Sequence, residues 1–168
     1  MVRAAFFDLD KTILDTSSNV ALSGPFIEAG LMNRRTAITS VLVQLPYLLT
    51  GADESRMEQM AQALGRMGRG WNAAFLEATV EDALERTIQP VCYAQALARI
   101  EQHKRAGDII VIASASVEQV VRPIAQMLGA DEVLASRAAV DEDGCFTGEI
   151  THFNQAQGKA AQSGQRLK

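Results

Sequence analysis

The first apolar segment of the chain lies near its N-terminus. Residues Arg3 to Leu9 form a short apolar run that ends in acidic residues, a pattern typical of a strand buried on both faces rather than of an amphipathic helix. From Asp15 to about Glu85 the apolar residues recur at helical spacing, and glycines divide this segment into three or four expected helices, followed by a helical stripe over Trp71 to Leu84. The first half of the chain therefore predicts one strand and then a helical region.

After Pro90 the apolar pattern alternates between two periods. Short β-branched runs predict strands, and apolar stripes closed by glycine predict helices. In chain order the prediction is a helix over Val91 to Lys104, a strand over Ile109 to Ala113, a helix over Val117 to Leu128, a strand over Glu132 to Ala135 and a hairpin turn at Asp143-Gly144. Strands that alternate with helices indicate an α/β fold with a doubly wound parallel sheet, in which ligands lie beyond the carboxyl ends of the strands.

The composition is that of an ordinary globular protein. The chain has 168 residues, of which 48% are hydrophobic and 21% are charged, and its net charge of -4 includes no basic cluster that would attract nucleic acid. The two cysteines, Cys92 and Cys145, fit no CxxC pattern and predict neither a disulfide framework nor a zinc site. We expect no signal peptide, no membrane span and a cytoplasmic location.

The strongest chemical signal follows the first predicted strand. Asp8 and Asp10 lie two residues apart where the strand ends, and Thr12 follows them. Because the chain turns there, both carboxylates can point at one reacting centre. Two acids in such a place repel each other and lose hydration unless a cation or a proton-transfer role keeps them there. The alternative is a polar strand exit in which Asp10 or Thr12 merely caps the next helix.

Two weaker signals lie further along the chain. Ser114 and Ser116 end the second buried strand just before a helix, where a hydroxyl and free helix amides can hold an anion, although either serine can equally be a plain cap. Lys159 follows Gly158, and a lone lysine indicates little because most lysines are solvated. Neither signal predicts a function without the acidic motif.

Together these residues resemble the haloacid dehalogenase superfamily, and more closely its phosphoserine-phosphatase-like branch. The match consists of Asp8-Leu9-Asp10-Lys11-Thr12 for the first motif, Ser114 for the second and Lys159 for the third. The resemblance implies an α/β core over residues 1–14 and 89–168, with a helical cap inserted over residues 15–88. It also implies a phosphatase that acts on a small phosphoester through an aspartyl-phosphate.

The resemblance gives each matched residue an expected role. Asp8 would be the nucleophile, and Asp10 the general acid and then the general base. Thr12, Ser114 and Lys159 would form the phosphate-binding group. Thr12 would fix the loop that carries the two acids, while Ser114 and Lys159 would hold the phosphoryl oxygens. A carboxylate at about 4 Å from a phosphate charge costs about 4 kcal/mol at an effective dielectric near 20, so a magnesium ion is expected on the Asp8 carboxylate and the Asp10 main-chain carbonyl.

The sequence departs from the family pattern in two places. Relatives carry a fourth, acidic motif after the lysine, whereas this chain ends at Lys168 without it. We expect a fragment of a longer polypeptide, or else a natural truncation with weak magnesium binding and turnover. Ser17 stands where phosphoserine enzymes place a glutamate for the substrate's amino group, which argues against free phosphoserine as the substrate.

One apolar stripe of the expected cap has two interpretations. The stripe of Val41, Leu42, Leu45 and Tyr47 lines a pocket or, as is more common, packs in the core.

The missing motif leaves a second function open. Without the strand that would follow it, the first strand becomes a sheet edge that can pair with a second copy of the chain. The alternative to an enzyme is therefore a catalytically inactive fold that forms a homodimer or binds a partner through this edge. A dehalogenase is less expected, because Asp10 supplies a leaving-group acid that carbon–halogen chemistry does not require.

Overall fold

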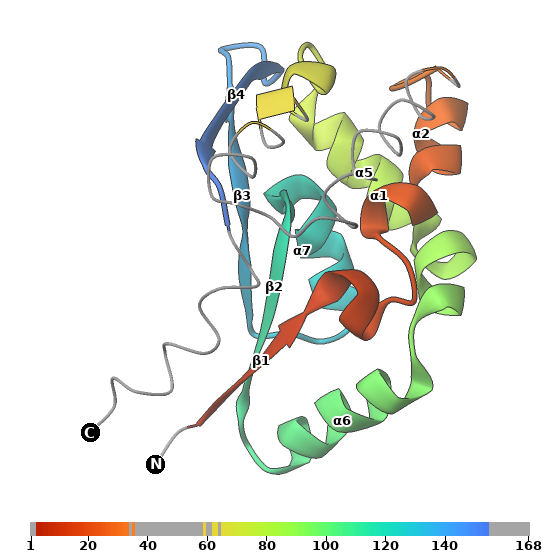
Figure 1. The fold of residues 1–168 in the computed structure, drawn as a ribbon, viewed down its shortest axis with the longest axis vertical. Coiled ribbons are helices and arrows are strands. Elements are labelled where there is room, and N and C mark those ends of the chain that lie inside the picture. The colour runs from red at the N-terminus through yellow and green to blue at the C-terminus, as the bar shows by residue number, and fades with distance from the viewer. Residues whose placement is uncertain (1–2, 34, 36–58, 60–61, 64, 155–168) are drawn as a thin grey trace.

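The central feature of the molecule is a four-stranded sheet. A computed structural model describes residues 3–33, 35, 59, 62–63 and 65–154, and in it the strands have the order β1-β2-β3-β4 (Figure 1). The strands β1 (Ala4–Asp8), β2 (Ile109–Val117) and β3 (Glu132–Val140) are parallel, and β4 (Phe146–His152) runs antiparallel to β3. The arrangement confirms the predicted α/β class with a mostly parallel sheet.

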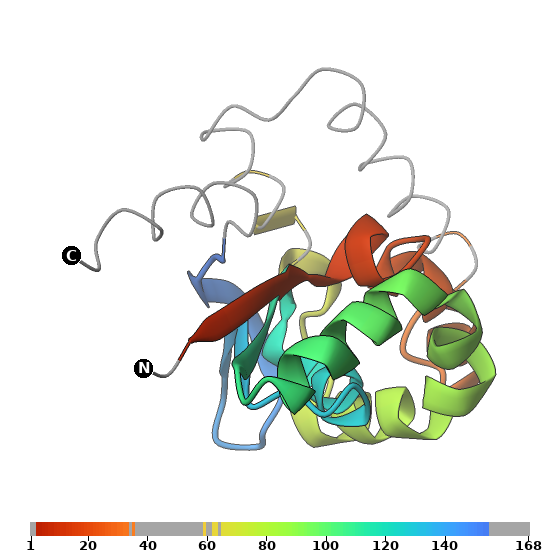
Figure 2. The same ribbon diagram turned by 90° about the horizontal axis from the view of Figure 1, so that it is seen from below.

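Two helices connect the parallel strands. They are α6 (Ala94–Arg105) before β2 and α7 (Glu118–Met127) after it, and both pack against the same face of the sheet (Figure 2). The core lies between this face and the helices, where Ile112 of β2 and Ile124 of α7 are fully buried. At about 25 cal/mol per Å² of apolar area, this burial is the main force that holds the helices to the sheet.

The types of the predicted strands and helices after Pro90 are right, but the predicted strands end too early. β2 continues four residues beyond Ala113 to Val117, and β3 continues to Val140, because both strands gain partners that their sequences do not reveal. The helix expected from Val91 begins at Ala94, since Gln89–Val91 forms a separate 3-10 turn. The predicted turn at Asp143-Gly144 is confirmed, and Gly144 has the positive φ of 75° that this turn requires.

The expectation that the first strand is buried on both faces is wrong for the described part of the chain. Ala4 is exposed and the Phe6 side chain is 51% exposed, whereas Ile110, Val111 and Ile112 of β2 are all buried. The reason is position in the sheet: β1 pairs with β2 alone among the described strands, and the two crossover helices cover only the opposite face. An apolar run predicts a strand, but burial depends on its neighbours.

Between β1 and α6 the described residues are mostly helical. The described helices are α1 (Ser18–Ala21), α2 (Ser23–Glu28) and α5 (Ala73–Ala83), followed by a wide helical turn at Leu84–Ile88. The two ends of this segment lie side by side, because Leu14 forms an antiparallel bridge with Cys92 and the Tyr93 amide donates to the Ile13 carbonyl at 2.8 Å. The expected helix with Val41, Leu42, Leu45 and Tyr47 lies outside the described residues. In the part of the chain that the structure describes, no helix has the length and apolar character needed to cross a bilayer.

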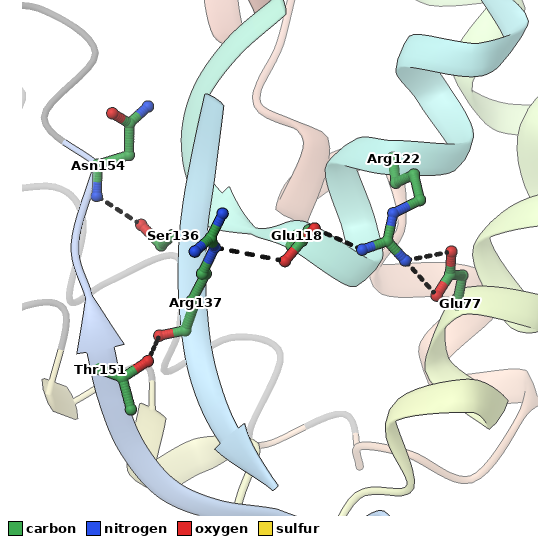
Figure 3. Close-up of polar contacts among 7 residues, drawn as sticks. All are labelled: Glu77, Glu118, Arg122, Ser136, Arg137, Thr151 and Asn154. Atoms are coloured by element: carbon green, nitrogen blue, oxygen red, sulfur yellow. Dashed lines mark hydrogen bonds and ion pairs between the residues drawn. The ribbon is translucent and has the colours of Figure 1, made fainter. Parts of the chain in front are cut away.

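An ion-pair network connects α5, α7 and β3 (Figure 3). The Arg122 guanidinium of α7 donates to both carboxylate oxygens of Glu77 on α5, at 3.0 and 3.1 Å, and to Glu118 at 2.5 Å. Glu118 in turn lies 3.8 Å from Arg137 of β3. The side chains of Arg122 and Glu77 are 36% and 25% exposed, so their attraction is less screened than that of fully exposed pairs.

This difference in exposure gives a stability prediction. In a double-mutant cycle of Glu77→Gln and Arg122→Gln, we expect a coupling free energy of unfolding of about 1 kcal/mol, at the upper end of the range for surface pairs. The control is the Glu101–Arg105 pair of α6, whose side chains are 54% and 78% exposed and should couple by about 0.4 kcal/mol. Urea denaturation at low and high salt measures both cycles. Equal coupling in the two pairs would contradict the prediction.

Candidate active site

The sheet register brings the acidic and serine motifs together. Asp8, the last residue of β1, is paired with Ala113 of β2, so the chain segments that follow both residues emerge at the same edge of the sheet. Because β1 and β2 are parallel neighbours, their carboxyl ends lie side by side. Asp8, Asp10 and Ser114 are therefore neighbours in space although about a hundred residues separate the motifs.

A tight turn after β1 orients Asp10. Over Leu9–Ile13 the backbone is not a regular helix: Lys11 has a φ of 59°, in the left-handed region, and the Leu14 amide donates to the Leu9 carbonyl at 3.0 Å. This turn directs Asp10 toward two donors. Its Oδ2 accepts from the Ser114 hydroxyl at 3.1 Å and its Oδ1 from the Ser18 amide at 2.6 Å. Asp10 thus joins β2 to the start of α1.

Asp8 has a different environment from Asp10. The Thr12 hydroxyl donates to Asp8 Oδ2 at 3.4 Å, a long hydrogen bond. Burial raises the pKa of Asp8 above its usual value of 3.8, and the neighbouring Asp10 carboxylate raises it further, while the hydrogen bonds from Thr12 and from the Leu9 amide lower it. The two carboxylates therefore lie close enough to repel each other, as the sequence predicts.

Ser114 is enclosed by hydrogen bonds. It is fully buried, and its Oγ donates to Asp10 and accepts from the Ser116 amide at 3.1 Å. The Ser116 hydroxyl lies 3.1 Å from the hydroxyl of Ser18, the buried first residue of α1. In this state the Ser114 hydroxyl proton is directed at Asp10. To hold an anion instead, the hydroxyl has to rotate away from that carboxylate.

Asn154, just after β4, forms hydrogen bonds that hold the end of β2 in place. Its side-chain amide donates to the Ser114 carbonyl at 3.0 Å and to the Leu134 carbonyl at 2.8 Å. Its main-chain amide donates to the Ser136 hydroxyl at 3.0 Å (Figure 3), and that hydroxyl donates to the Ala115 carbonyl at 2.7 Å. Asn154 and Ser136 thereby hold the consecutive main-chain carbonyls of Ser114 and Ala115, which helps to set the position of Ser114.

The donor set meets the needs of a hard divalent cation only in part. Asp8 offers a carboxylate, and repulsion between Asp8 and Asp10 favours a positive charge between them. Both oxygens of the Asp10 side chain already accept hydrogen bonds, which leaves its main-chain carbonyl as the second donor. No group of three or more acidic, histidine or cysteine side chains suited to a metal occurs among the residues that the structure describes. Two protein oxygens suit magnesium, which keeps several waters.

The structure gathers Asp8, Asp10, Thr12 and Ser114 at one edge of the sheet, and Lys159 lies outside the described residues. Sequence reasoning missed the contributions of Ser18, Ser136 and Asn154. Ser18 had a local signal, because Ser17 and Ser18 precede an apolar stripe as helix caps do. Ser136 and Asn154 had none, since their contacts depend on the pairing of β2, β3 and β4.

Fold and site together define an α/β protein with an acidic centre at the carboxyl end of its parallel strands. Residues 5–167 match the model of the haloacid dehalogenase-like hydrolase family, and the chain belongs to this family. It is 43% identical over 157 residues to a Streptomyces azureus protein named for inhibition of morphological differentiation, and 43% identical over 157 residues to a Mycobacterium tuberculosis protein named a probable phosphatase. These alignments cover 94% of this chain but 57% and 54% of the relatives, so the chain spans about half of their length.

Solved structures support the fold. A Bordetella pertussis protein of unknown function is similar with a TM-score of 0.73 at 24% identity, over 89% of this chain and 66% of that one. A phosphoserine phosphatase solved as a phospho-aspartyl intermediate analogue is similar with a TM-score of 0.62 at 17% identity, over 90% of this chain and 63% of that one. At these identities the likeness shows a shared fold.

The raised pKa of Asp8 predicts a pH-dependent stability. Folded Asp8 keeps its proton to a higher pH than unfolded Asp8, whose pKa is near 3.8. Between the pKa of the unfolded state and that of the folded state, the folded protein binds more protons. Its free energy of unfolding therefore falls as pH rises through this range. In metal-free buffer we expect Asp8→Asn to melt at a higher temperature than the wild type at pH 7, with a difference that shrinks toward pH 4. Thermal melts with chelator present measure this. Asp82→Asn, at an exposed carboxyl of α5, controls for loss of one charge, and a difference that grows as pH falls would contradict the prediction.

The Asn154 contacts predict a cost of truncation. Asn154→Ala leaves the Ser114 and Leu134 carbonyls without their donor, and we expect it to lower the free energy of unfolding by about 1–3 kcal/mol. The matched control is Thr151→Ala on β4, which removes a single exposed hydrogen bond to the Arg137 carbonyl and should cost about 0.5 kcal/mol (Figure 3). Urea denaturation compares the two variants. A loss no larger in Asn154→Ala than in Thr151→Ala would show that Asn154 does not hold Ser114.

Proposed function

We propose that this chain is the catalytic part of a phosphomonoester hydrolase that works through an aspartyl-phosphate on Asp8. The observation that carries the proposal is the hydrogen bond from Ser114 to Asp10, which puts the acidic motif of β1 and the serine motif of β2 in one centre. Membership of the haloacid dehalogenase-like hydrolase family and a relative named a probable phosphatase support it. The substrate would be a small phosphorylated metabolite.

The two carboxylates have separate roles in this reaction. A carboxylate oxygen of Asp8 attacks phosphorus, and the bond between phosphorus and the alcohol oxygen breaks while Asp10 gives that oxygen its proton. A water then attacks the phosphorus of the acyl-phosphate, Asp10 removes the water's proton, and Asp8 is released with inorganic phosphate. Asp10 suits proton transfer because the Ser114 hydroxyl and the Ser18 amide hold its carboxylate in one orientation.

The remaining motif residues would hold the phosphoryl group. The Ser114 hydroxyl, once rotated from Asp10, and the Lys159 ammonium would balance the charge on the phosphoryl oxygens. Thr12 would keep Asp8 in place through the hydrogen bond that it donates to Oδ2. Lys159 comes five positions after Asn154, whose side chain contacts the Ser114 carbonyl, so the chain is long enough for Lys159 to reach this centre.

A magnesium ion would complete the site. The Asp8 carboxylate and the Asp10 main-chain carbonyl would bind it, with waters and phosphate oxygens as its other ligands. The ion would neutralise charge on the phosphoryl group during transfer. A cation beside Asp8 would also lower the pKa of its carboxyl, opposing the effects of burial and of Asp10, so that the nucleophile stays ionised.

The domain division forms part of the same proposal. Residues 1–14 and 89–168 would form the core and residues 15–88 a helical cap that closes over the site and selects the alcohol part of the substrate. The antiparallel contacts between Leu14 and Cys92, at the two ends of the insertion, are those expected of a hinge between cap and core. We place the enzyme in the cytoplasm, where Cys92 and Cys145 stay reduced.

One observation favours a second function. Among the described strands β1 lies at the edge of the sheet, and its Phe6 side chain is 51% exposed. An exposed edge strand with an apolar side chain can pair with another chain. On this alternative the fold is an inactive module that forms a homodimer or binds a partner. The experiment on Asp8 and Asp10 separates the two functions, because an inactive module does not form an adduct on Asp8.

Substitution of each acid tests the proposal. In the full polypeptide that carries this sequence, with magnesium and beryllofluoride, which mimics a phosphoryl group, we expect an adduct on Asp8 that is detectable by fluorine NMR and lost in Asp8→Asn. Asp10→Asn should keep the adduct but lower the rate of phosphate release by about 10²–10⁴-fold, the usual contribution of a general acid and base. Asp82→Asn on α5 is the control and should keep both. Undiminished phosphate release by Asp8→Asn, or no adduct on the wild type, would refute the enzymatic function.

A further inference from the structure

A cavity lies beside the acidic centre, past the carboxyl end of β2. Its volume is about 110 Å³, and its walls come from the end of β2, the hairpin of β3 and β4, the turn before α5, and α2. Large apolar side chains dominate these walls, among them Phe26, Trp71, Phe146 and Phe153. Phe26 and Trp71 meet edge to face with ring centres 6.0 Å apart, an arrangement that favours packing of the two rings against each other.

The cavity adjoins Asp10 through residues that hold Asp10 in place. Ser116, in the cavity wall, donates its amide to Ser114, whose hydroxyl donates to Asp10. Asn19, also in the wall, directly follows Ser18, whose amide donates to the other oxygen of Asp10. The proposed reaction requires the leaving alcohol beside Asp10, because Asp10 gives its proton to the alcohol oxygen. The cavity therefore borders the residues that position Asp10, next to the place where the proposed reaction would need room for the alcohol.

The walls offer little to a charged group. Among the described residues that line the cavity there is no Asp, Glu, Lys, Arg or His side chain. The hydroxyls of Ser116 and Ser136 in the wall are already hydrogen-bonded, to Ser18 and to the Ala115 carbonyl. Apart from the Asn19 amide, a charged group that enters such a site finds no charged partner among these residues, so most of its lost hydration is not compensated. An apolar group gains free energy by leaving water there.

We propose that this cavity binds the alcohol part of the substrate, and that the substrate class is phosphomonoesters of compact, uncharged, largely apolar alcohols. The inference rests on the proposed function and narrows it. A cavity of 110 Å³ is somewhat smaller than the engineered protein cavity of about 150 Å³ that binds benzene, so a short alkyl chain or a single small ring is the expected size. On this proposal, amino-acid phosphates, with their ammonium and carboxylate groups, are expected to be poor substrates.

Two isosteric esters test this preference. Butyl phosphate and 3-aminopropyl phosphate have chains of equal length that differ only in a terminal methyl or ammonium group. In the full polypeptide that carries this sequence, with magnesium present, we expect kcat/KM for butyl phosphate to be at least about tenfold higher. From ethyl to butyl phosphate, kcat/KM should rise by up to about fourfold per added methylene. Equal values for the two isosteres, or a preference for the amine, would overturn the inference.

Variants of the cavity wall sharpen the test. Met67→Glu places a carboxylate in the wall and should lower kcat/KM for butyl phosphate about tenfold while moving the preference toward the amine. Phe75→Glu, at a residue of α5 that is 50% exposed and outside the cavity, is the matched control and should leave the preference unchanged. If Met67→Glu does not fold, Ala138→Leu narrows the cavity without adding charge and should reduce the advantage of butyl over ethyl phosphate. An unchanged preference in a folded wall variant would overturn the inference.

The outcomes also separate this inference from the proposed function. Hydrolysis of both isosteres with no preference, together with a beryllofluoride adduct on Asp8, overturns the substrate class and leaves the phosphatase intact. No hydrolysis of either ester and no adduct on Asp8 overturns the proposed function and this inference with it.

Discussion

The parallel pairing of β1 with β2 is the constraint on which the site depends. Because Asp8 is in register with Ala113, the turn after β1 and the serines that end β2 emerge at the same edge of the sheet. A slip of one residue would turn Asp8 to the opposite face of the sheet, away from its present neighbours. The buried side chains of β2, such as Ile110 and Ile112, make that slip costly, so packing in the core maintains the geometry of the centre.

Asp10 links this centre to the helices that follow β1. One oxygen accepts from Ser114 of the sheet and the other from the Ser18 amide at the start of α1. An acidic group near the first amides of a helix is favourable, so the contact that orients Asp10 also holds the start of α1. Asp10 therefore both anchors α1 and, on the proposed mechanism, transfers the proton. The Arg122–Glu77 ion pair connects α5 to α7.

The electrostatics of the centre and the character of the cavity point to one chemistry. Two carboxylates held close together favour a cation, and a bound cation would in turn attract a phosphoryl group, whereas the cavity beside them favours an uncharged group. A phosphomonoester of an apolar alcohol combines both properties in one molecule, with a charged end for Asp8 and an apolar end for the cavity wall. On the proposed function, the charged and apolar ends of such an ester would contact separate parts of the protein.

The sequence by itself determined the class of the fold and the acidic motif. Short apolar runs at Ile109 to Ala113 and elsewhere predicted the parallel strands, because β-branched residues in short runs pack well in a buried sheet, and two acids at a strand end required a chemical explanation. Only the tertiary structure decided the exposure of Phe6, the role of Asn154 and the cavity beside Asp10. These properties depend on contacts between segments far apart in the chain. The local pattern of apolar and polar residues does not determine which of these segments pack against each other.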